Sequence, residues 1–107
     1  MTESEWDRLS WDRKSFLLLQ KIAPFYYLEG GHLMKNGVHF YVDPQALSIA
    51  AESHIKLRNL KSEYISALTH LLIGDNTPDR DDLWTFVTAT PSERCLVAYN
   101  CLEAQHG

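Results

Sequence analysis

The sequence has no hydrophobic run near the roughly 18 residues that a membrane-spanning helix needs. It also has no N-terminal apolar segment followed by a cleavage site, so we expect no secretory signal. Cysteine is scarce. Cys95 and Cys101 are its two occurrences, and a spacing of six residues puts them on different faces of a helix. These absences predict a cytoplasmic protein with reduced thiols and no membrane partner.

A basic segment is missing as well. The formal net charge is −4, and because residues 1–74 are neutral as a whole, the acidic excess falls in residues 75–107. Phosphate contacts supply most of the affinity for nucleic acids and need a basic surface. We therefore expect no binding to DNA or RNA.

The common catalytic signatures are also absent: no glycine-rich phosphate loop, no His-Glu-x-x-His, no Cys-x-x-Cys and no nucleophile elbow. Cys95 lies near a predicted helix start, where the helix dipole can lower a thiol pKa, but no base lies near it in the sequence. We interpret it as a small buried apolar residue beside Ala98 and Leu102. The sequence thus predicts a protein that is not an enzyme and uses no cofactor.

What is present is the composition of an ordinary domain, with 45% hydrophobic and 22% charged residues among 107. We expect a single globular domain spanning residues 1–107. A capping box at Thr2 opens a predicted helix that runs to about Ile22, with a possible kink at Ser10. A second capping box at Thr90 opens a last helix that ends near Leu102.

Asn36-Gly37 is a strong signal for a β-hairpin with a two-residue turn. That turn pairs Lys35 with Val38 and Met34 with His39, and continues outward to His32 and Tyr41. Alternation along the strands separates two faces. The predicted core face consists of Leu33, Val38, Phe40 and Val42.

The segment after Asp43-Pro44 carries no helix breaker as far as Leu72, so it predicts one helix of about 30 residues. Thr77-Pro78 then opens a predicted short helix that ends by Ala89. The expected fold class is α+β and mostly helical, in the order helix, hairpin, long helix, short helix, helix.

The opposite face of the hairpin carries two histidines, a methionine and a tyrosine. Two imidazoles and a thioether suit a soft metal, but the sequence places no carboxylate or thiolate beside them. We therefore predict no metal site and interpret this face as an interaction surface. Its residues are His32, Met34, His39 and Tyr41.

The predicted long helix presents His54, Arg58 and Lys61 within its apolar stripe, at helical spacing. Three interpretations stay open. The side chains can extend to solvent past the core, pair with acidic groups of this chain (Asp81 and Asp82 are candidates) or of a second subunit, or bind a small anion.

Beyond generic cap and turn motifs, nothing in the sequence resembles a known family. The leading hypothesis is a small non-enzymatic interaction module, either a regulatory or adaptor protein or a subunit of an assembly. The alternative is a protein that binds a small anion through His54, Arg58 and Lys61. We also expect a homodimer, because a helix of about 30 residues is longer than a small domain is wide.

Overall fold

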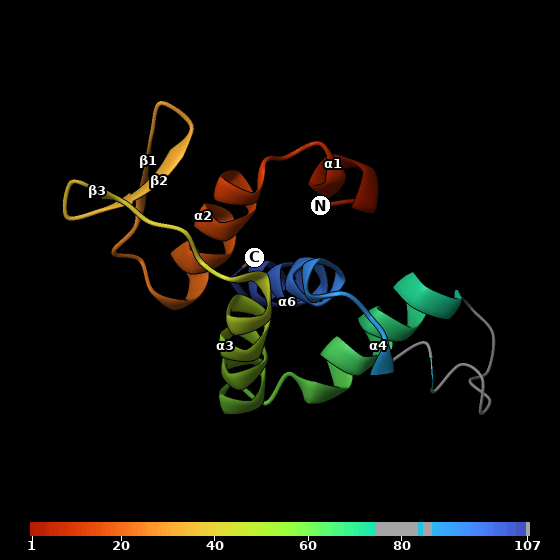
Figure 1. Cartoon of the computed structure of the whole chain (residues 1–107). Coiled ribbons are helices and arrows are strands. Elements are labelled where there is room, and N and C mark those ends of the chain that lie inside the picture. Colours follow the sequence, from red (N-terminus) through yellow and green to blue (C-terminus); the bar gives the residue numbers. More distant parts are fainter. Residues whose placement is uncertain (75–83, 85–86, 107) are drawn as a thin grey trace.

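The structure, a computed structural model, describes residues 1–74, 84 and 87–106. Helix α6 lies in the middle of the molecule, with the other helices packed around it and a small sheet at one end (Figure 1). The molecule is elongated, with principal extents of 48 × 25 × 22 Å. The predicted α+β class with mostly helical content is confirmed. The helices are α1 (Glu3–Asp7), α2 (Trp11–Ile22), α3 (Pro44–Leu57), α4 (Lys61–Ile73) and α6 (Pro91–His106).

The N-terminal segment forms two helices instead of one kinked helix. Ser10 has an extended backbone, and its hydroxyl accepts a hydrogen bond from the amide of Arg13, which makes Ser10 the N-cap of α2. The capping box between Thr2 and Glu5 is confirmed. Because α1 and α2 are separate helices, Trp6 of α1 can point into the core. There its indole Nε1 donates a hydrogen bond to Ser92 at the start of α6.

The sheet has three antiparallel strands in the order β1 (Tyr27–Glu29), β2 (His32–Lys35), β3 (Val38–His39). The predicted turn is confirmed, since Asn36 and Gly37 have φ angles of 55° and 78°. So are the pairs Lys35 with Val38 and Met34 with His39. Strand β1 was not predicted. The Gly-Gly pair at 30–31, which also has positive φ angles, makes a second hairpin turn and was the available signal.

The predicted core face of the hairpin is only half correct. Leu33 is fully buried and Val42 packs against the core, but Val38 is 61% exposed and Phe40 is 40% exposed. Helix α2 packs against β1 and β2, so the covered part of this face lies over the first two strands. Strand β3, at the edge of the sheet, lies outside the part that α2 covers.

The predicted helix of about 30 residues is wrong, because α3 ends at Leu57 and α4 begins at Lys61. Asn59 takes a left-handed conformation with φ at 58°. Its amide donates to the carbonyl of Lys56, and the amide of Leu60 donates to that of Ile55. Those two hydrogen bonds are the Schellman motif that ends helices, with asparagine where glycine is usual.

A part-buried polar cluster, consisting of Glu52, Tyr64 and Arg94, connects α3, α4 and α6. The Tyr64 hydroxyl donates to Glu52 Oε2 over 2.6 Å, and Arg94 Nη1 donates to the same oxygen over 3.2 Å. Burial first, and then the hydrogen bond to the carboxylate, raises the pKa of Tyr64 well above its usual range. One carboxylate thus fixes the positions of two helices against the third.

The capping box at Thr90 is confirmed by reciprocal hydrogen bonds with Glu93. The predicted short helix from Thr77-Pro78 falls mainly on residues outside the described part of the chain. In the described helices, none is both long enough and apolar enough to cross a membrane.

We predict that Gly37→Val lowers the free energy of unfolding by at least about 1 kcal/mol, because a β-branched residue at positive φ is strained. No heavy atom lies within 4 Å of a Cβ built at Gly37, so backbone strain alone causes the loss. Gly37→Asn is the matched control, since asparagine tolerates this conformation. Urea unfolding measures both variants, and equal stability of Gly37→Val and wild type would contradict the turn assignment.

Candidate functional site

Two histidines of the sheet and one aspartate of α2 converge at the outer side of the hairpin. Asp12 Oδ2 lies 3.2 Å from His39 Nε2 and 3.8 Å from His32 Nδ1. The two imidazole rings pack edge to face, with centroids 5.1 Å apart. One donor atom from each of the three residues lies within 4.8 Å of the other two. We call Asp12, His32 and His39 the Asp-His-His cluster.

The first turn of α2 holds the Asp12 carboxylate against the sheet. The amide of Leu33, a fully buried residue, donates to Asp12 Oδ2 over 3.2 Å. Next to it, the indole of Trp11 donates to the carbonyl of Val42 over 2.7 Å. Two neighbouring residues of α2 therefore bind the middle strand and the segment that follows β3.

The prediction from the sequence that no carboxylate lies beside His32 and His39 is therefore wrong. Asp12 lies 20 residues before His32 in the chain, and only the packing of α2 on the sheet brings them together. The sequence carries a weak signal, since an acidic residue in the first turn of a helix is common for electrostatic reasons alone. The predicted shared face of His32 and His39 is confirmed by their ring contact.

The other two residues of the predicted interaction surface differ in accessibility. Met34 is half-buried, whereas Tyr41 is 66% exposed. Val38 and Phe40 are also exposed, so three of the four residues from 38 to 41 are large, exposed and apolar. We call residues 38–41 the edge segment.

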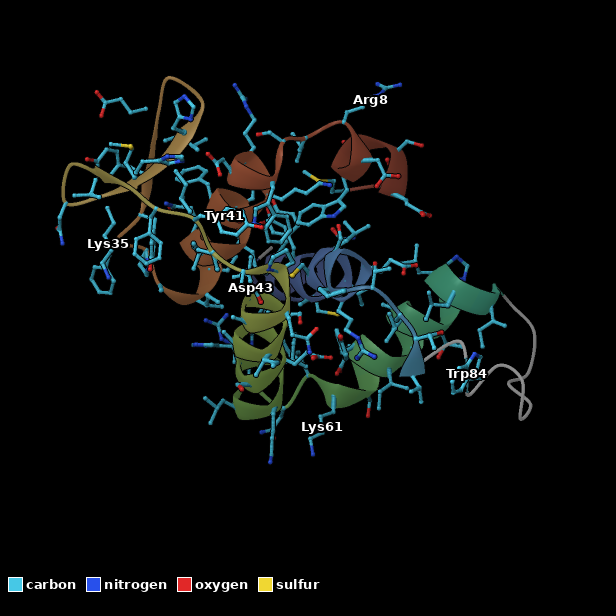
Figure 2. All side chains as sticks on the ribbon, viewed as in Figure 1. Arg8, Lys35, Tyr41, Asp43, Lys61 and Trp84 are labelled. Carbon is cyan, nitrogen blue, oxygen red and sulfur yellow. The ribbon has the colours of Figure 1, made fainter. Side chains whose placement is uncertain are left out.

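The three cations of the predicted row do not share one helix. His54 belongs to α3, Arg58 is the C-cap of α3, and Lys61 is the first residue of α4. Lys61 is exposed and projects away from α6 (Figure 2). It lines a shallow polar hollow at the helix break together with Lys56, Asn59 and Ser62.

Arg58 has partners within the fold. Its guanidinium Nη2 donates to the carbonyl of Lys21 over 2.9 Å, and Nη1 donates to Gln105 Oε1 over 3.3 Å. Lys21 is in the last turn of α2, where helix carbonyls lack intrahelical partners. Arg58 thus connects the ends of α2 and α6 with the end of α3. The candidate acids Asp81 and Asp82 lie outside the described residues.

We predict that Arg58→Met lowers the free energy of unfolding by about 1–2 kcal/mol, because a helix-end carbonyl loses its charged donor. Lys61→Met is the matched control and should change stability by less than about 0.5 kcal/mol, since its side chain is exposed. Thermal unfolding of both variants, with and without millimolar phosphate, measures this. A phosphate-dependent gain in wild type that Arg58→Met abolishes would instead support the anion-binding hypothesis.

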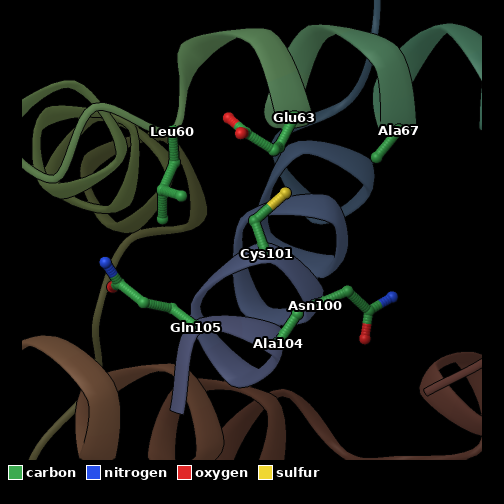
Figure 3. Close-up of a pocket in the computed structure, with 7 residues that line it drawn as sticks. All are labelled: Leu60, Glu63, Ala67, Asn100, Cys101, Ala104 and Gln105. Carbon is green, nitrogen blue, oxygen red and sulfur yellow. The ribbon is translucent and has the colours of Figure 1, made fainter. Parts of the chain in front are cut away.

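An apolar groove of about 420 Å³ lies between α4 and α6 (Figure 3). Cys101 is on its α6 side, and Glu63 faces it from α4. Burial, and to a smaller extent the Glu63 carboxylate, raises the pKa of the Cys101 thiol. Cys95 is fully buried, as predicted, and burial followed by the charge of Glu52 raises its pKa to about 12. Both cysteines are free, and neither environment favours a thiolate.

We predict that iodoacetamide at pH 8 modifies Cys95 at least about a hundredfold more slowly in the native chain than in urea, because a raised pKa leaves few thiolates. Peptide mapping distinguishes it from Cys101, which lines the groove and should react first. Stability should also fall as pH rises above the ordinary thiol pKa, since the unfolded thiol ionises there and the native one does not. Rapid native modification of Cys95 would contradict its assignment as a structural residue.

Comparison of the chain with models of protein families, with curated proteins and with solved structures finds no match.

Proposed function

We propose that this protein is a non-enzymatic interaction module that assembles through the open edge of β3, and that its partner there is a second copy of the same chain. The observation that carries the proposal is the edge segment. Val38 lies in β3, one of the two edge strands, and Phe40 and Tyr41 follow this strand; all three are exposed. Clustered exposed apolar residues on a soluble domain usually mark an interaction surface.

The main chain of the edge segment is available for pairing. The amide of Phe40 donates inward to the carbonyl of Leu33 over 2.9 Å. Hydrogen-bonding groups alternate in direction along an antiparallel strand, so the amide and carbonyl of His39 face away from β2. An added strand would bind these groups, as in β-augmentation.

The edge segment lacks two kinds of side chain that normally discourage such pairing. Natural edges carry lysine, proline or a bulge, and the edge segment has no lysine or proline. The nearest lysine, Lys35, lies on β2, and its ammonium is 5.2 Å from the centre of the Tyr26 ring. Its charge is thus drawn to the aromatic ring on its own face.

A second copy of the edge segment is a suitable partner because antiparallel pairing of identical strands about a two-fold axis is self-complementary. Val38 and Phe40 occupy one face, so each copy would cover the apolar pair of the other. The segment is short, and the interface would be small, so we expect a weak dimer with Kd in the micromolar range. The homodimer no longer draws support from helix length, since the long helix is two shorter helices.

The alternative hypothesis, anion binding by His54, Arg58 and Lys61, has less support. Arg58 already donates to Lys21 and Gln105, and the helix break separates Lys61 from the other two. What favours it is the polar hollow, where Lys56 and Lys61 lie together.

We predict that the wild-type chain sediments as a monomer–dimer equilibrium at micromolar concentration, and that Val38→Lys shifts it to monomer. A lysine here puts a charge on the apolar face and repels the same charge in the other copy. Ile49→Lys is the matched control, because Ile49 is a β-branched residue of similar exposure on α3. It should leave the equilibrium unchanged. A 12.3 kDa species at every concentration, or equal effects of the two variants, would overturn the proposal.

A further inference from the structure

Two imidazoles and one carboxylate from three separate segments converge at the start of α2. His32 belongs to β2 and His39 to β3, while Asp12 comes from the first turn of α2. In the described part of the chain this is the one group of three histidine, cysteine, aspartate or glutamate side chains whose donor atoms approach each other closely enough for a metal ion.

Hydrogen bonding within the protein accounts for only part of this arrangement. The 3.2 Å separation between Asp12 Oδ2 and His39 Nε2 is within hydrogen-bond range, but the 3.8 Å separation to His32 Nδ1 is not. His32 therefore directs a ring nitrogen at a carboxylate oxygen to which it is not hydrogen-bonded. A cation between the three groups would use that nitrogen directly.

We propose that Asp12, His32 and His39 form a binding site for a first-row divalent transition metal, with Zn²⁺ as the ion that the ligand set fits best. Two neutral imidazoles and a carboxylate are a common set of three protein ligands for zinc, and water takes the open position. Hard cations such as Mg²⁺ prefer oxygen ligands and are disfavoured by the two nitrogens.

The side chains can reach a metal geometry with small movements. Donor atoms around a tetrahedral Zn²⁺ lie about 3.3 Å apart, given bond lengths near 2 Å, and in the structure they lie within 4.8 Å. His32 and His39 are exposed, so their rings can turn without disturbing the core. Asp12 is the fixed member, since it is half-buried.

The surroundings of the carboxylate resemble those of metal ligands. Carboxylates that bind metals usually accept a further hydrogen bond that orients them. The amide of the buried Leu33 provides such a bond to Asp12 Oδ2. That oxygen has a second lone pair for a metal, and Oδ1 provides further capacity.

The test is titration of the tag-free chain with Zn²⁺ by calorimetry, and with Co²⁺ by visible absorption. We expect one ion per chain and Co²⁺ bands of the intensity typical of four-coordinate nitrogen–oxygen sites. Asp12→Asn, His32→Gln and His39→Gln should each weaken Zn²⁺ binding at least about tenfold. Mg²⁺ should produce no saturable heat.

His70→Gln is the matched control, because His70 is an exposed histidine on α4, outside the cluster. It should bind Zn²⁺ as wild type does. His32→Gln removes the ligand that lies beyond hydrogen-bond range of Asp12, so this variant should keep the metal-free melting temperature and report on metal alone. No saturable Zn²⁺ binding by wild type, or an equal loss in His70→Gln, would overturn the proposal and leave an ion pair only.

Discussion

Burial of α6 is the constraint on which the rest of the fold depends. Four consecutive residues of this helix, Cys95 to Ala98, are buried, so this part of the helix is covered on every side. Helices α2, α3 and α4 all pack against it. Because α6 is the last helix of the chain, most of the core is built from contacts between residues far apart in the sequence.

The same constraint explains the break between α3 and α4. A straight helix of about 30 residues would be roughly 45 Å long, and only part of it could lie on the 16 residues of α6. The Schellman motif at Asn59 lets the chain change direction, so that Ile55 and Tyr64 both reach the core. Arg58, and the hydrogen bonds of Tyr64 and Arg94 to Glu52, then fix the two helices with polar contacts. Arg58, which the sequence pattern placed as a cation within an apolar stripe, connects the ends of three helices.

Motifs that depend on neighbouring residues were predicted correctly from the sequence, whereas the packing of distant segments against one another was not. The capping boxes at Thr2 and Thr90 and the turn at Asn36-Gly37 depend on neighbouring residues alone, and all three are confirmed. The helix end at Asn59 was missed because asparagine is less specific for left-handed backbone than glycine.

The site shows the same division between local and long-range information. Alternation placed His32 and His39 on one face, which the ring contact confirms. It could not place Asp12, since that depends on how α2 packs, or show that α2 stops short of covering Val38. The sequence therefore predicted that the two histidines lie together, but it did not predict that Asp12 lies beside both of them.

Both proposals concern the hairpin, and a common physical reason connects them. Three strands of three, four and two residues form a sheet that is marginal in isolation. The Leu33 amide donates to Asp12 and therefore not to the carbonyl of Phe40. One main-chain hydrogen bond, from the Phe40 amide to the Leu33 carbonyl, joins these two residues. The edge strand is thus held by few main-chain bonds. A metal ion joining His39 to Asp12 would fix the edge strand to α2, and a second copy would add main-chain bonds on its other side. Whichever event occurs first would order the edge strand, so the second event would lose less conformational entropy. Metal binding and self-pairing should therefore favour one another.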